Sequence, residues 1–391
     1  MNYRISQRAA ALSPSLTLAI DAKAKQMKAE GQDVVGFGAG EPDFDTPQHI
    51  KDAAAQALAS GFTKYTPASG IPELRQAIAD KFKRENGLSY RPSQIIVSCG
   101  GKHSCYNLIL ATCQEGDEVI IPAPYWLSYP EMVKLAGARP VILETTDQTE
   151  FKVTPEQLRA AVNARTRLFV LNSPSNPTGS VYTPEEIQAL GDICVEKDVL
   201  IMSDEIYEHL LYDGAKHRSV ASFSQAHFEH TIVVHGFAKA WSMTGWRLGF
   251  LAAPDPIARA IDAIQSHSTS NPTSFAQKGA VAALTGPQDH LPRWLAEYDK
   301  RRTYAWKKLN SIPGVSCVNS TGAFYLFPNI SRLGLKSTEF CATLLEAEKV
   351  AAVPGIAFGA DEYIRLSYAT SMANIEKGLD RLEKFARSLA R

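Results

Sequence analysis

The sequence has 391 residues, of which 45% are hydrophobic and 21% are charged, and such a chain can bury a large core, here expected as two domains. Lys+Arg and Asp+Glu both number 41, so the chain has no net charge that would attract nucleic acid or an anionic membrane surface. We therefore expect a soluble globular protein with no nucleic-acid partner and no membrane partner.

The six cysteines form no CxxC pair and show no Cys/His spacing typical of a metal site. We interpret them as buried thiols in a reducing cytoplasm, and we expect no bound metal. The N-terminus begins with a mildly basic stretch, but Ser13, Pro14 and Ser15 interrupt its apolar part. No signal peptide is predicted, and no apolar segment reaches membrane-spanning length.

Residues 17–31 have the periodicity of a helix, which could pack with either domain. Beyond them, apolar runs of strand length alternate with segments of helical period. Seven runs are predicted strands: 94–100, 117–125, 138–145, 166–174, 199–207, 231–237 and 246–254. Helices are predicted between them at 102–116, 129–137, 154–164 and 183–198. Continuous Val/Ile/Leu strands separated by helices are typical of an α/β fold with a mostly parallel, seven-stranded sheet covered by helices on both faces.

The last hundred residues have a different pattern, with a strand-like segment at 322–329 and a charged helix at 371–391. This pattern predicts a second, smaller α+β domain. We expect residues 48–285 to form the large domain, and residues 1–47 together with 286–391 to form the small one.

Polar and aromatic residues follow five of the predicted strands, where a parallel sheet binds its ligands. These residues are Gly100, Gly101 and Lys102; Tyr125 and Trp126; Asn176; Asp204 with Tyr207; and Lys239, leading to Arg247. Each has an ordinary alternative, since a lysine is usually a solvated surface residue, Asp204 could cap a helix, Trp126 could belong to the core, and SCGGK is too short to identify a phosphate loop. Together at one sheet edge, they are better explained by a common ligand.

The residue types fit one cofactor. A lysine can bond covalently to an aldehyde where a desolvated, electropositive site lowers its pKa, and Arg247 would supply positive charge beside Lys239. Pyridoxal phosphate requires such a lysine, an aspartate that keeps its ring nitrogen protonated, and donors for its phosphate. Asp204 can hold the ring nitrogen, while Tyr207 and Asn176 can reach the phenolic oxygen.

The remaining residues suit the ring face and the phosphate. Trp126 can stack on the ring, and the backbone N–H groups of Gly101 and Lys102, which begin a predicted helix after Gly100, suit a phosphate. We therefore expect pyridoxal 5'-phosphate as the cofactor.

Nine segments in order carry a resemblance to a known family. They are GAGEPDFDTP (38–47), KYTPASGIPELR (64–75), GGKHSCYN (100–107), PYWLSYPEMV (124–133), NSPSNPTG (172–179), SDEIYEHLLY (203–212), FAKAWSMTGWRLGF (237–250), SHSTSNPTS (266–274) and IRLSYATS (364–371). Over essentially its whole length the chain resembles the class I aminotransferases, which are pyridoxal phosphate enzymes of fold type I. Within them it is most similar to the bacterial aspartate aminotransferases. Nine ordered segments are far more specific than any single motif.

The resemblance implies roles for individual residues. Lys239 is expected to bind the cofactor covalently, and Arg247 to bind its phosphate. Tyr65 resembles the tyrosine that reaches the cofactor phosphate of the neighbouring subunit, which implies a homodimer with shared active sites. Gly40 falls where the main chain lines the substrate pocket, and Arg365 where a bidentate fork grips the substrate α-carboxylate. The alternative for Arg365 is an exposed charge on a strand.

Trp126 and Asn176, already assigned to the cofactor, are expected to contact the substrate as well. Two departures from the family pattern are visible. Many members carry hydroxyl side chains directly before the lysine and two positions earlier, where this chain has Ala238 and Gly236. Ser266 stands where animal and enteric aspartate enzymes have a second arginine for the distal carboxylate.

Lys102 is our candidate for the distal carboxylate, because close bacterial relatives use a lysine at the matching position. The competing interpretation is that Lys102 only offsets the charge of the cofactor phosphate or begins the helix. A lysine is a point charge and not a fork, so it should leave some room for aromatic or other substrates.

The expected function is a ping-pong aminotransferase that moves the amino group of L-aspartate to 2-oxoglutarate, giving oxaloacetate and L-glutamate, with Lys239 as the general base. An aspartate/prephenate or aromatic amino acid aminotransferase is the nearest alternative. A pyridoxal phosphate lyase acting at the β-carbon and a non-catalytic regulator with the same fold are further alternatives. The regulator is disfavoured because every catalytic position is filled.

Overall fold

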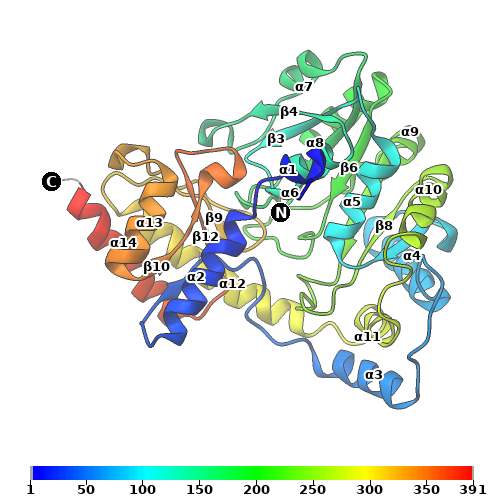
Figure 1. Cartoon of the computed structure of the whole chain (residues 1–391), viewed down its shortest axis with the longest axis horizontal. Helices are drawn as coiled ribbons and strands as arrows, with labels where there is room; N and C mark the ends of the chain where they lie inside the picture. Colours follow the sequence, from blue (N-terminus) through cyan, green and yellow to red (C-terminus); the bar gives the residue numbers. More distant parts are fainter. Residues whose placement is uncertain (1–2, 390–391) are drawn as a thin grey trace.

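The computed structural model describes residues 3–389, apart from the side chains of residues 18 and 21. Its largest feature is a seven-stranded sheet with the order β2-β8-β7-β6-β5-β3-β4 (Figure 1). Its strands are β2 (Ile95–Ser98), β3 (Glu118–Ala123), β4 (Arg139–Glu144), β5 (Thr166–Asn172), β6 (Leu200–Asp204), β7 (Thr231–Gly236) and β8 (Gly249–Ala252). Only β8 runs antiparallel to its neighbours. The seven predicted strands and the mostly parallel sheet are confirmed.

Helices cover both faces of this sheet. Successive side chains of a strand point to opposite faces, and because both sets are apolar here, both faces are buried by helices. In β5, Leu168 and Val170 pack on one face, and Phe169 and Leu171 on the other. The first face packs against α5 (Gly101–Thr112), α6 (Ser128–Leu135) and α10 (Asp255–Ser266). The second packs against α7 (Pro155–Ala161) and α8 (Pro184–Glu196).

The predicted helices 154–164 and 183–198 both open on Thr-Pro, and in both the threonine caps the helix. Thr154 accepts a hydrogen bond from the Gln157 amide at the start of α7, and Thr183 accepts one from the Glu186 amide at the start of α8. In both helices the third residue bonds back to the amide of the capping threonine, which completes a capping box. These local signals explain why the helices between the strands could be predicted.

Further helices complete this part of the molecule. Residues of α4 (Pro72–Asn86) and α11 (Ser274–Thr285) pack with β2, β7 and β8 in one cluster. The remaining helices here are α3 (Gln48–Ala59) and α9 (Gln225–His230), and α1 (Gln7–Ala10) lies near the N-terminus.

A second, smaller part contains two small sheets. One has the order β11-β12-β9 and is antiparallel; the other pairs β1 with β10. The strands are β1 (Val35–Gly36), β9 (Tyr325–Leu326), β10 (Val350–Ala351), β11 (Val353–Pro354) and β12 (Ile364–Ser367). The accompanying helices are α2 (Leu16–Ala29), α12 (His290–Asn310), α13 (Ser337–Glu348) and α14 (Met372–Leu389). The predicted C-terminal helix is confirmed within the described residues; residues 390–391 lie outside them.

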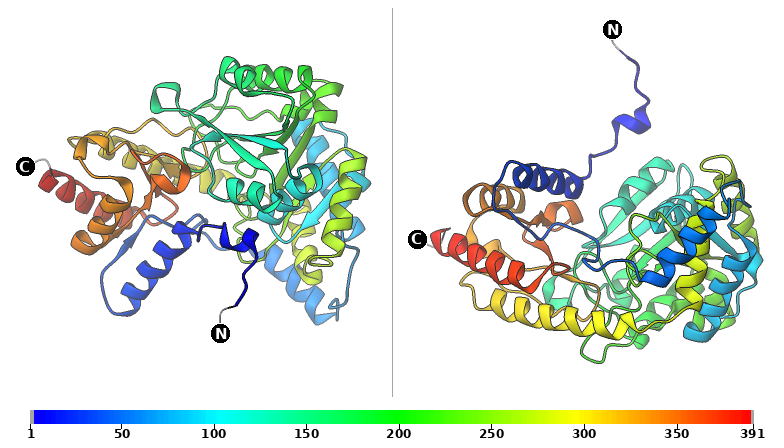
Figure 2. Two further views of the ribbon diagram at one scale, coloured as in Figure 1. Left: turned by 45° about the horizontal axis from the view of Figure 1, so that its top comes forward. Right: turned by 90° about the horizontal axis from the view of Figure 1, so that it is seen from below.

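N-terminal and C-terminal segments meet in this smaller part, as Figure 2 shows for α2 (blue) and the orange helix α13. Val35 pairs with Val350, and Met27 of α2 shares a hydrophobic cluster with Leu345 of α13. The predicted helix at 17–31 therefore packs with the C-terminal part. Where the two domains begin and end along the chain stays a prediction, and residues 1–2 lie outside the described residues. Within residues 3–389, no helix combines the length and the apolar character needed to cross a membrane.

Candidate active site

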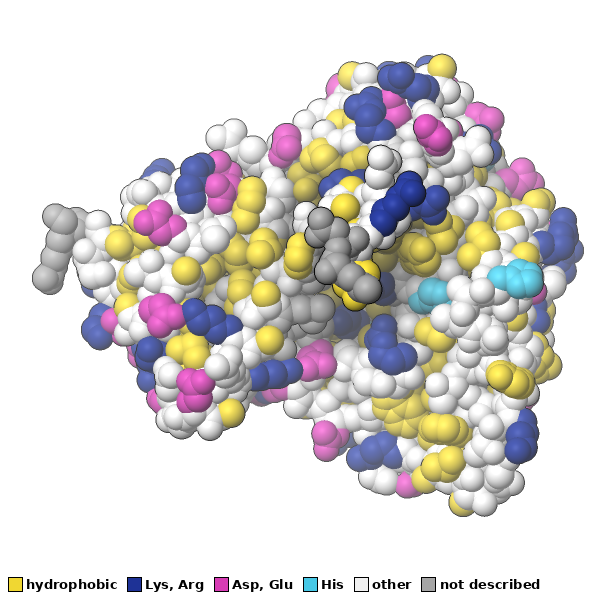
Figure 3. Space-filling view, in the orientation of Figure 1, with side chains coloured by type: hydrophobic (Ala, Val, Ile, Leu, Met, Phe, Trp, Pro, Cys, Tyr) yellow, Lys and Arg dark blue, Asp and Glu magenta, His cyan; other side chains and the backbone are white. Residues whose placement is uncertain are grey.

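A cavity of about 480 Å³ lies at the sheet edge where β5, β6 and β7 end, and the smaller part of the molecule closes it from the other side. The space-filling view shows a hollow between the two parts, with Lys and Arg side chains around it (Figure 3). Most of the predicted site residues line this cavity: Gly40, Gly101, Lys102, Trp126, Asn176, Asp204, Tyr207, Lys239, Arg247 and Arg365. Gly100 and Tyr65 do not.

Lys239 follows β7 by three residues and points its ammonium group into the cavity. Its Nζ donates to the carbonyl of Gly40, which belongs to the loop after β1. Burial, followed by the positive charges of Arg365 and Arg247, lowers the pKa of Lys239 from 10.5 to about 8. About a tenth of the Lys239 amine is therefore unprotonated at pH 7, far more than for a free lysine, and this is the form that a nucleophile or general base requires.

Asp204 is the last residue of β6, and its carboxylate is buried behind the cavity. Burial raises its pKa from 3.8 to about 6, while hydrogen bonds from the Tyr129 hydroxyl at 2.6 Å and the Ile206 amide at 3.3 Å act in the opposite direction. Asn172 donates to the Asp204 carbonyl at 3.0 Å, which fixes the strand end. A carboxylate held in this way can keep a ring nitrogen protonated.

Tyr207 lies in the turn after β6, and its hydroxyl is 2.8 Å from that of Tyr325 on β9. Both rings are buried, and the Lys239 ammonium is 5.7 Å from the centre of the Tyr207 ring. This pair of hydroxyls joins the main sheet to the smaller part beside Lys239.

A group of backbone amides and Arg247 lies at the start of α5. The first two helix amides, those of Gly101 and Lys102, have no carbonyl in their own helix to bond, so they are free to hold an anion. Gly100 has φ +95°, and a Cβ there would lie 2.5 Å from Nη2 of Arg247. Glycine at this position therefore lets the guanidinium come close to the helix start, even though Gly100 does not line the cavity.

Arg365 on β12 is buried, and its fork faces the same cavity. Nη1 donates to the Asn176 side-chain oxygen at 3.0 Å, Nη2 donates to the Gly38 carbonyl at 2.8 Å, and Nε has no hydrogen-bond partner. The guanidinium carbon is 4.6 Å from the centre of the Tyr325 ring. The alternative of an exposed strand charge at Arg365 is therefore wrong.

The cavity holds more positive charge than its acidic residues offset. Lys102, Lys239, Arg247 and Arg365 contact backbone carbonyls, an amide oxygen or aromatic rings, and none of them forms an ion pair with a carboxylate among the side chains that the structure describes. Burial and the charge of Arg247 also lower the pKa of Lys102. Because uncompensated charges in a partly closed site are costly, the arrangement suits a ligand with several anionic groups.

Comparison with known proteins agrees with this geometry. Residues 32–382 match the family described as aminotransferase class I and II. The chain is 52% identical to the aspartate aminotransferase of Bacillus subtilis (strain 168) over 387 residues, which cover 98% of each chain. It is 49% identical to the aspartate/prephenate aminotransferase of Nitrosomonas europaea, over 97% of this chain and 98% of the relative. This chain belongs to the class I and II aminotransferase family.

Solved structures of aminotransferases have the same fold. The aspartate aminotransferase from Rhizobium meliloti superposes with a TM-score of 0.95 at 40% identity, over 99% of both chains. The Thermus thermophilus enzyme with maleate gives a TM-score of 0.94 at 44% identity, over 98% of this chain and 100% of that one. Like its family, this aminotransferase depends on pyridoxal phosphate.

The described residues of this aminotransferase fit that cofactor. The amides at the start of α5 and Arg247 suit a phosphate, the buried carboxylate of Asp204 suits a ring nitrogen, and the amine of Lys239 suits an aldehyde. Trp126 lines the same cavity, 5.0 Å from Lys102 measured from its ring centre. All of these residues already lie in or directly beside one cavity.

Several cavity residues of the aminotransferase were not predicted from its sequence. Tyr129 lies within a segment that carries the family resemblance, and Tyr325 lies within the predicted strand 322–329, but nothing in their spacing indicated a role. The other residues that were missed are Thr17, Lys25, Gly38, Ala39, Glu41, Leu127, Asn172, Ile206, Ala238 and Thr244. These residues line the cavity only because folding brings loops from both parts of the molecule together, so their positions in the sequence do not indicate a role.

Tyr65 and Ser266 lie outside the cavity of this chain. The Tyr65 side chain is 91% exposed, and Ser266 is an exposed residue at the end of α10. A role for Tyr65 at this site would need a second subunit, so it stays a prediction.

Proposed function

We propose that this aminotransferase moves the amino group of L-aspartate to 2-oxoglutarate, giving oxaloacetate and L-glutamate. The observation that carries the proposal is the set of four cations, Lys102, Lys239, Arg247 and Arg365, that line one cavity and form no ion pair with a carboxylate among the described side chains. A fifth, the exposed Lys25, also lines the cavity. Three anionic groups would compensate the four cations, namely the cofactor phosphate and the two carboxylates of a dicarboxylic substrate. Relatives named aspartate aminotransferase support this choice of substrate.

In this proposal the residues divide between cofactor and substrate. Gly100, Gly101 and Arg247 hold the phosphate, Trp126 lies on the ring, and Asp204 keeps the ring nitrogen protonated. Tyr207 and Asn176 serve the phenolic oxygen, with Asn176 also bound to Arg365, and Gly40 shapes the pocket beside the substrate. When bound, pyridoxal phosphate supplies an electron sink that acidifies the α-hydrogen of the amino acid.

The chain's own groups then perform the proton transfers. Arg365 takes the α-carboxylate through its fork, replacing a neutral environment by a charge-assisted pair. Lys239 is the point of covalent attachment of the cofactor. With Lys239 released from the cofactor, its Nζ would be the group that takes the α-proton and gives it back, and its lowered pKa of about 8 suits both directions.

Labelling tests the role of Lys239. The purified protein should be yellow, and borohydride reduction followed by peptide mapping should place the pyridoxyl group on Lys239. A label on Lys102 or on any other lysine would contradict the assignment. Lys239→Ala should bind the cofactor without covalent attachment and lose essentially all activity.

Lys102 decides the substrate range in this proposal. It projects at the start of α5, with its Nζ 5.0 Å from the centre of the Trp126 ring, and of the four cations it is the one not assigned to the phosphate, the aldehyde or the α-carboxylate. Lys102→Ala should cut kcat/KM for aspartate and glutamate by roughly 2 to 5 kcal/mol, the loss of one charge pair, and spare alanine and tyrosine. Lys134→Ala, at an exposed lysine on α6, is the control. Equal losses on all four substrates would assign Lys102 to the cofactor phosphate.

A second candidate is an aspartate/prephenate aminotransferase. Relatives between 44% and 49% identical carry that name, and a lysine binds a distal carboxylate with less geometric discrimination than an arginine fork. Half-reactions with aspartate, glutamate, tyrosine and alanine, followed by the reverse half-reaction with prephenate, separate the two candidates. Transfer to prephenate at a rate comparable with 2-oxoglutarate would favour the second.

We further propose a cytoplasmic homodimer. All six cysteines are free thiols, as a reducing compartment favours. The exposed Tyr65 is then available to the cofactor phosphate of the second subunit. Light scattering on the purified protein should give twice the mass of the 42.7 kDa chain. A monomer with full activity would contradict shared active sites.

A further inference from the structure

A second group of charged side chains lies behind the cofactor loops, outside the cavity. Its centre is the buried carboxylate of Glu208, the residue after Tyr207. Lys81 of α4, whose side chain is fully buried, places its ammonium against Glu208, and the Asn86 amide donates to the same carboxylate at 2.8 Å. On the side of the sheet, Nε2 of His235 is 2.9 Å from Oε1 of Glu208, a close polar contact in which the ring N–H is not aligned for a hydrogen bond.

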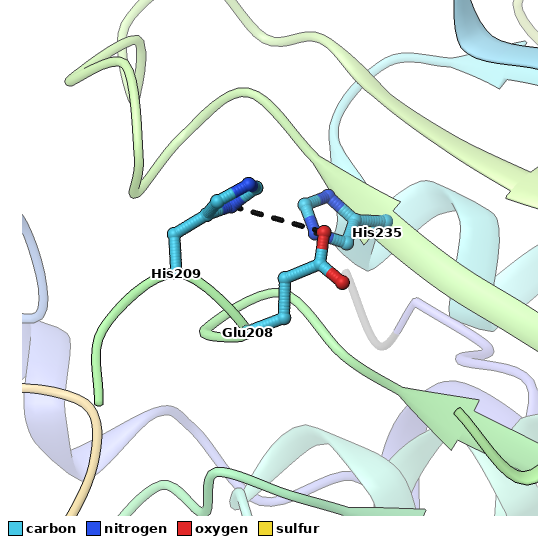
Figure 4. A group of neighbouring side chains, drawn as sticks. All are labelled: Glu208, His209 and His235. Carbon is cyan, nitrogen blue, oxygen red and sulfur yellow. Dashed lines mark ion pairs between the residues drawn. The ribbon is translucent and has the colours of Figure 1, made fainter. Parts of the chain in front are cut away.

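Figure 4 shows Glu208 between the rings of His209 and His235, a grouping that could by residue type hold a metal ion. The ammonium of Lys81, however, already lies against Glu208 and supplies the positive charge there. A metal ion would have to share one carboxylate with this ammonium in a buried site, where like charges repel strongly. The group is therefore better described as an ion pair with hydrogen bonds.

The hydrogen bonds of His235 define which ring nitrogen carries its proton. Nδ1 accepts from the Gly236 amide at 2.7 Å, so the proton of the neutral ring is on Nε2, which faces Glu208. Burial lowers the pKa of His235, which favours this neutral form. The ring stacks on Phe250 of β8, with centroids 5.1 Å apart and planes 17° from parallel.

The contact between His235 and Glu208 joins two separate loops. Glu208 lies in the turn after β6, next to Tyr207 and four residues after Asp204, the last residue of that strand. His235 lies in β7, four residues before Lys239, and β6 and β7 are neighbours in the sheet. Inside the cavity these two loops touch only weakly among the described side chains: the Lys239 ammonium lies 5.7 Å from the centre of the Tyr207 ring, and Asp204 and Lys239 form no ion pair.

We propose that His235 and Glu208, with Lys81 as counter-charge, are positioning residues that hold the loop of Lys239 in register with the loop of Asp204 and Tyr207. Neither residue touches the cavity; both act through the residues that do. A bridge of this kind fixes the separation between the amine that binds an aldehyde and the carboxylate that holds a ring nitrogen. Sub-ångström errors in such a separation reduce rates markedly. The inference rests on the proposed roles of Lys239 and Asp204.

Two substitutions of His235 distinguish loss of the contact with Glu208 from loss of the imidazole ring itself. His235→Asn keeps a short polar side chain that can accept from the Gly236 amide but cannot reach Glu208. His235→Gln is long enough to present a donor where Nε2 stands. Losing this close polar contact with a buried charge should cost about tenfold, so we expect the Asn variant to bind pyridoxal phosphate about tenfold more weakly as apo-protein.

Three further readouts distinguish positioning from a general loss of stability. In the Asn variant, kcat should fall about tenfold while KM for the amino donor changes less than about twofold, and the pH titration of the bound cofactor's visible absorption should shift. The Gln variant should stay within about threefold of wild type in each measurement. His227→Gln, at a buried histidine of α9 that lies outside both loops, is the control and should leave the titration unchanged.

Equal behaviour of the Asn and Gln variants, whether both resemble wild type or both are impaired, would overturn the proposal. If the Asn variant does not fold, the double variant Lys81→Met, Glu208→Leu removes both charges of the pair together and should show the same weaker cofactor binding; wild-type binding would overturn the proposal. Borohydride labelling of the wild type is done alongside. A label away from Lys239 overturns the proposed function and this inference together, whereas a label on Lys239 with indistinguishable variants overturns the inference alone.

Discussion

Replacing Asp204 by asparagine removes a buried charge and keeps the shape of the side chain and its ability to accept from Tyr129. On folding, the pKa of Asp204 rises from 3.8 to about 6, chiefly through burial. Each pKa unit corresponds to ~1.4 kcal/mol, so the ionised carboxylate lowers the free energy of unfolding by roughly 3 kcal/mol in the cofactor-free protein. Because the folded state holds this proton more tightly, the penalty is absent below pH 3.8 and complete above pH 6.

Urea denaturation of the apo-protein at pH 4 and pH 8 measures this penalty. We expect Asp204→Asn to match wild type near pH 4 and to be more stable by about 2 to 3 kcal/mol at pH 8. The more stable variant should nevertheless be the poorer enzyme. A neutral amide cannot hold the ring nitrogen of the bound cofactor protonated, so kcat of Asp204→Asn should collapse. Equal apo-stability at both pH values, or near wild-type kcat, would refute the assignment of Asp204.

Other substitutions test the neighbouring contacts. Arg365→Ala should reduce kcat/KM for every amino acid by roughly 2 to 5 kcal/mol because all present an α-carboxylate, with Arg365→Lys recovering only part of it; a loss confined to dicarboxylates would show that the two carboxylate sites are exchanged. Tyr129→Phe should raise the pKa of Asp204 further, because the 2.6 Å hydrogen bond holds it down, and should lower kcat about tenfold in steady-state assays. Tyr65→Phe should speed cofactor loss on dialysis; an unchanged rate would contradict a role of Tyr65 at the cofactor phosphate of the second subunit.

The sequence was sufficient to predict the strands and the edge of the sheet that carries the site. Each strand is a short run of β-branched and aliphatic residues between helices with recognisable caps, and the cap signals at Thr154 and Thr183 depend only on neighbours along the chain. The antiparallel β8 also agrees with the pattern, since its N-terminal end brings Arg247 to the edge where the parallel strands end.

Contacts between residues far apart in the sequence could not be predicted in this way. The hydroxyl pair of Tyr207 and Tyr325 joins residues 118 positions apart, and Lys81 reaches Glu208 over 127 positions. In the sequence, Lys81 has the appearance of an ordinary charged residue on an amphipathic helix, and its burial depends on how α4 docks on β2 and β7. The role of Tyr65 stays a prediction for the same reason, since its predicted partner belongs to another subunit.

Many family members have hydroxyl side chains at two positions before the lysine, where this chain has Gly236 and Ala238. At Gly236 the structure gives a reason for the absence of a hydroxyl. Gly236 pairs with Gly249 across β7 and β8, and a Cβ on Gly236 would lie 3.1 Å from the Gly249 Cα. A Cβ on Gly249 would lie 2.2 Å from the Gly101 nitrogen, so the start of α5 packs directly on the strand backbone. A serine at 236 would need the backbone of β8, on which the start of α5 packs, to give way by a few tenths of an ångström. The close packing thus favours backbone amides over side-chain hydroxyls, and it leaves Arg247 as the main charged group for the phosphate in this chain.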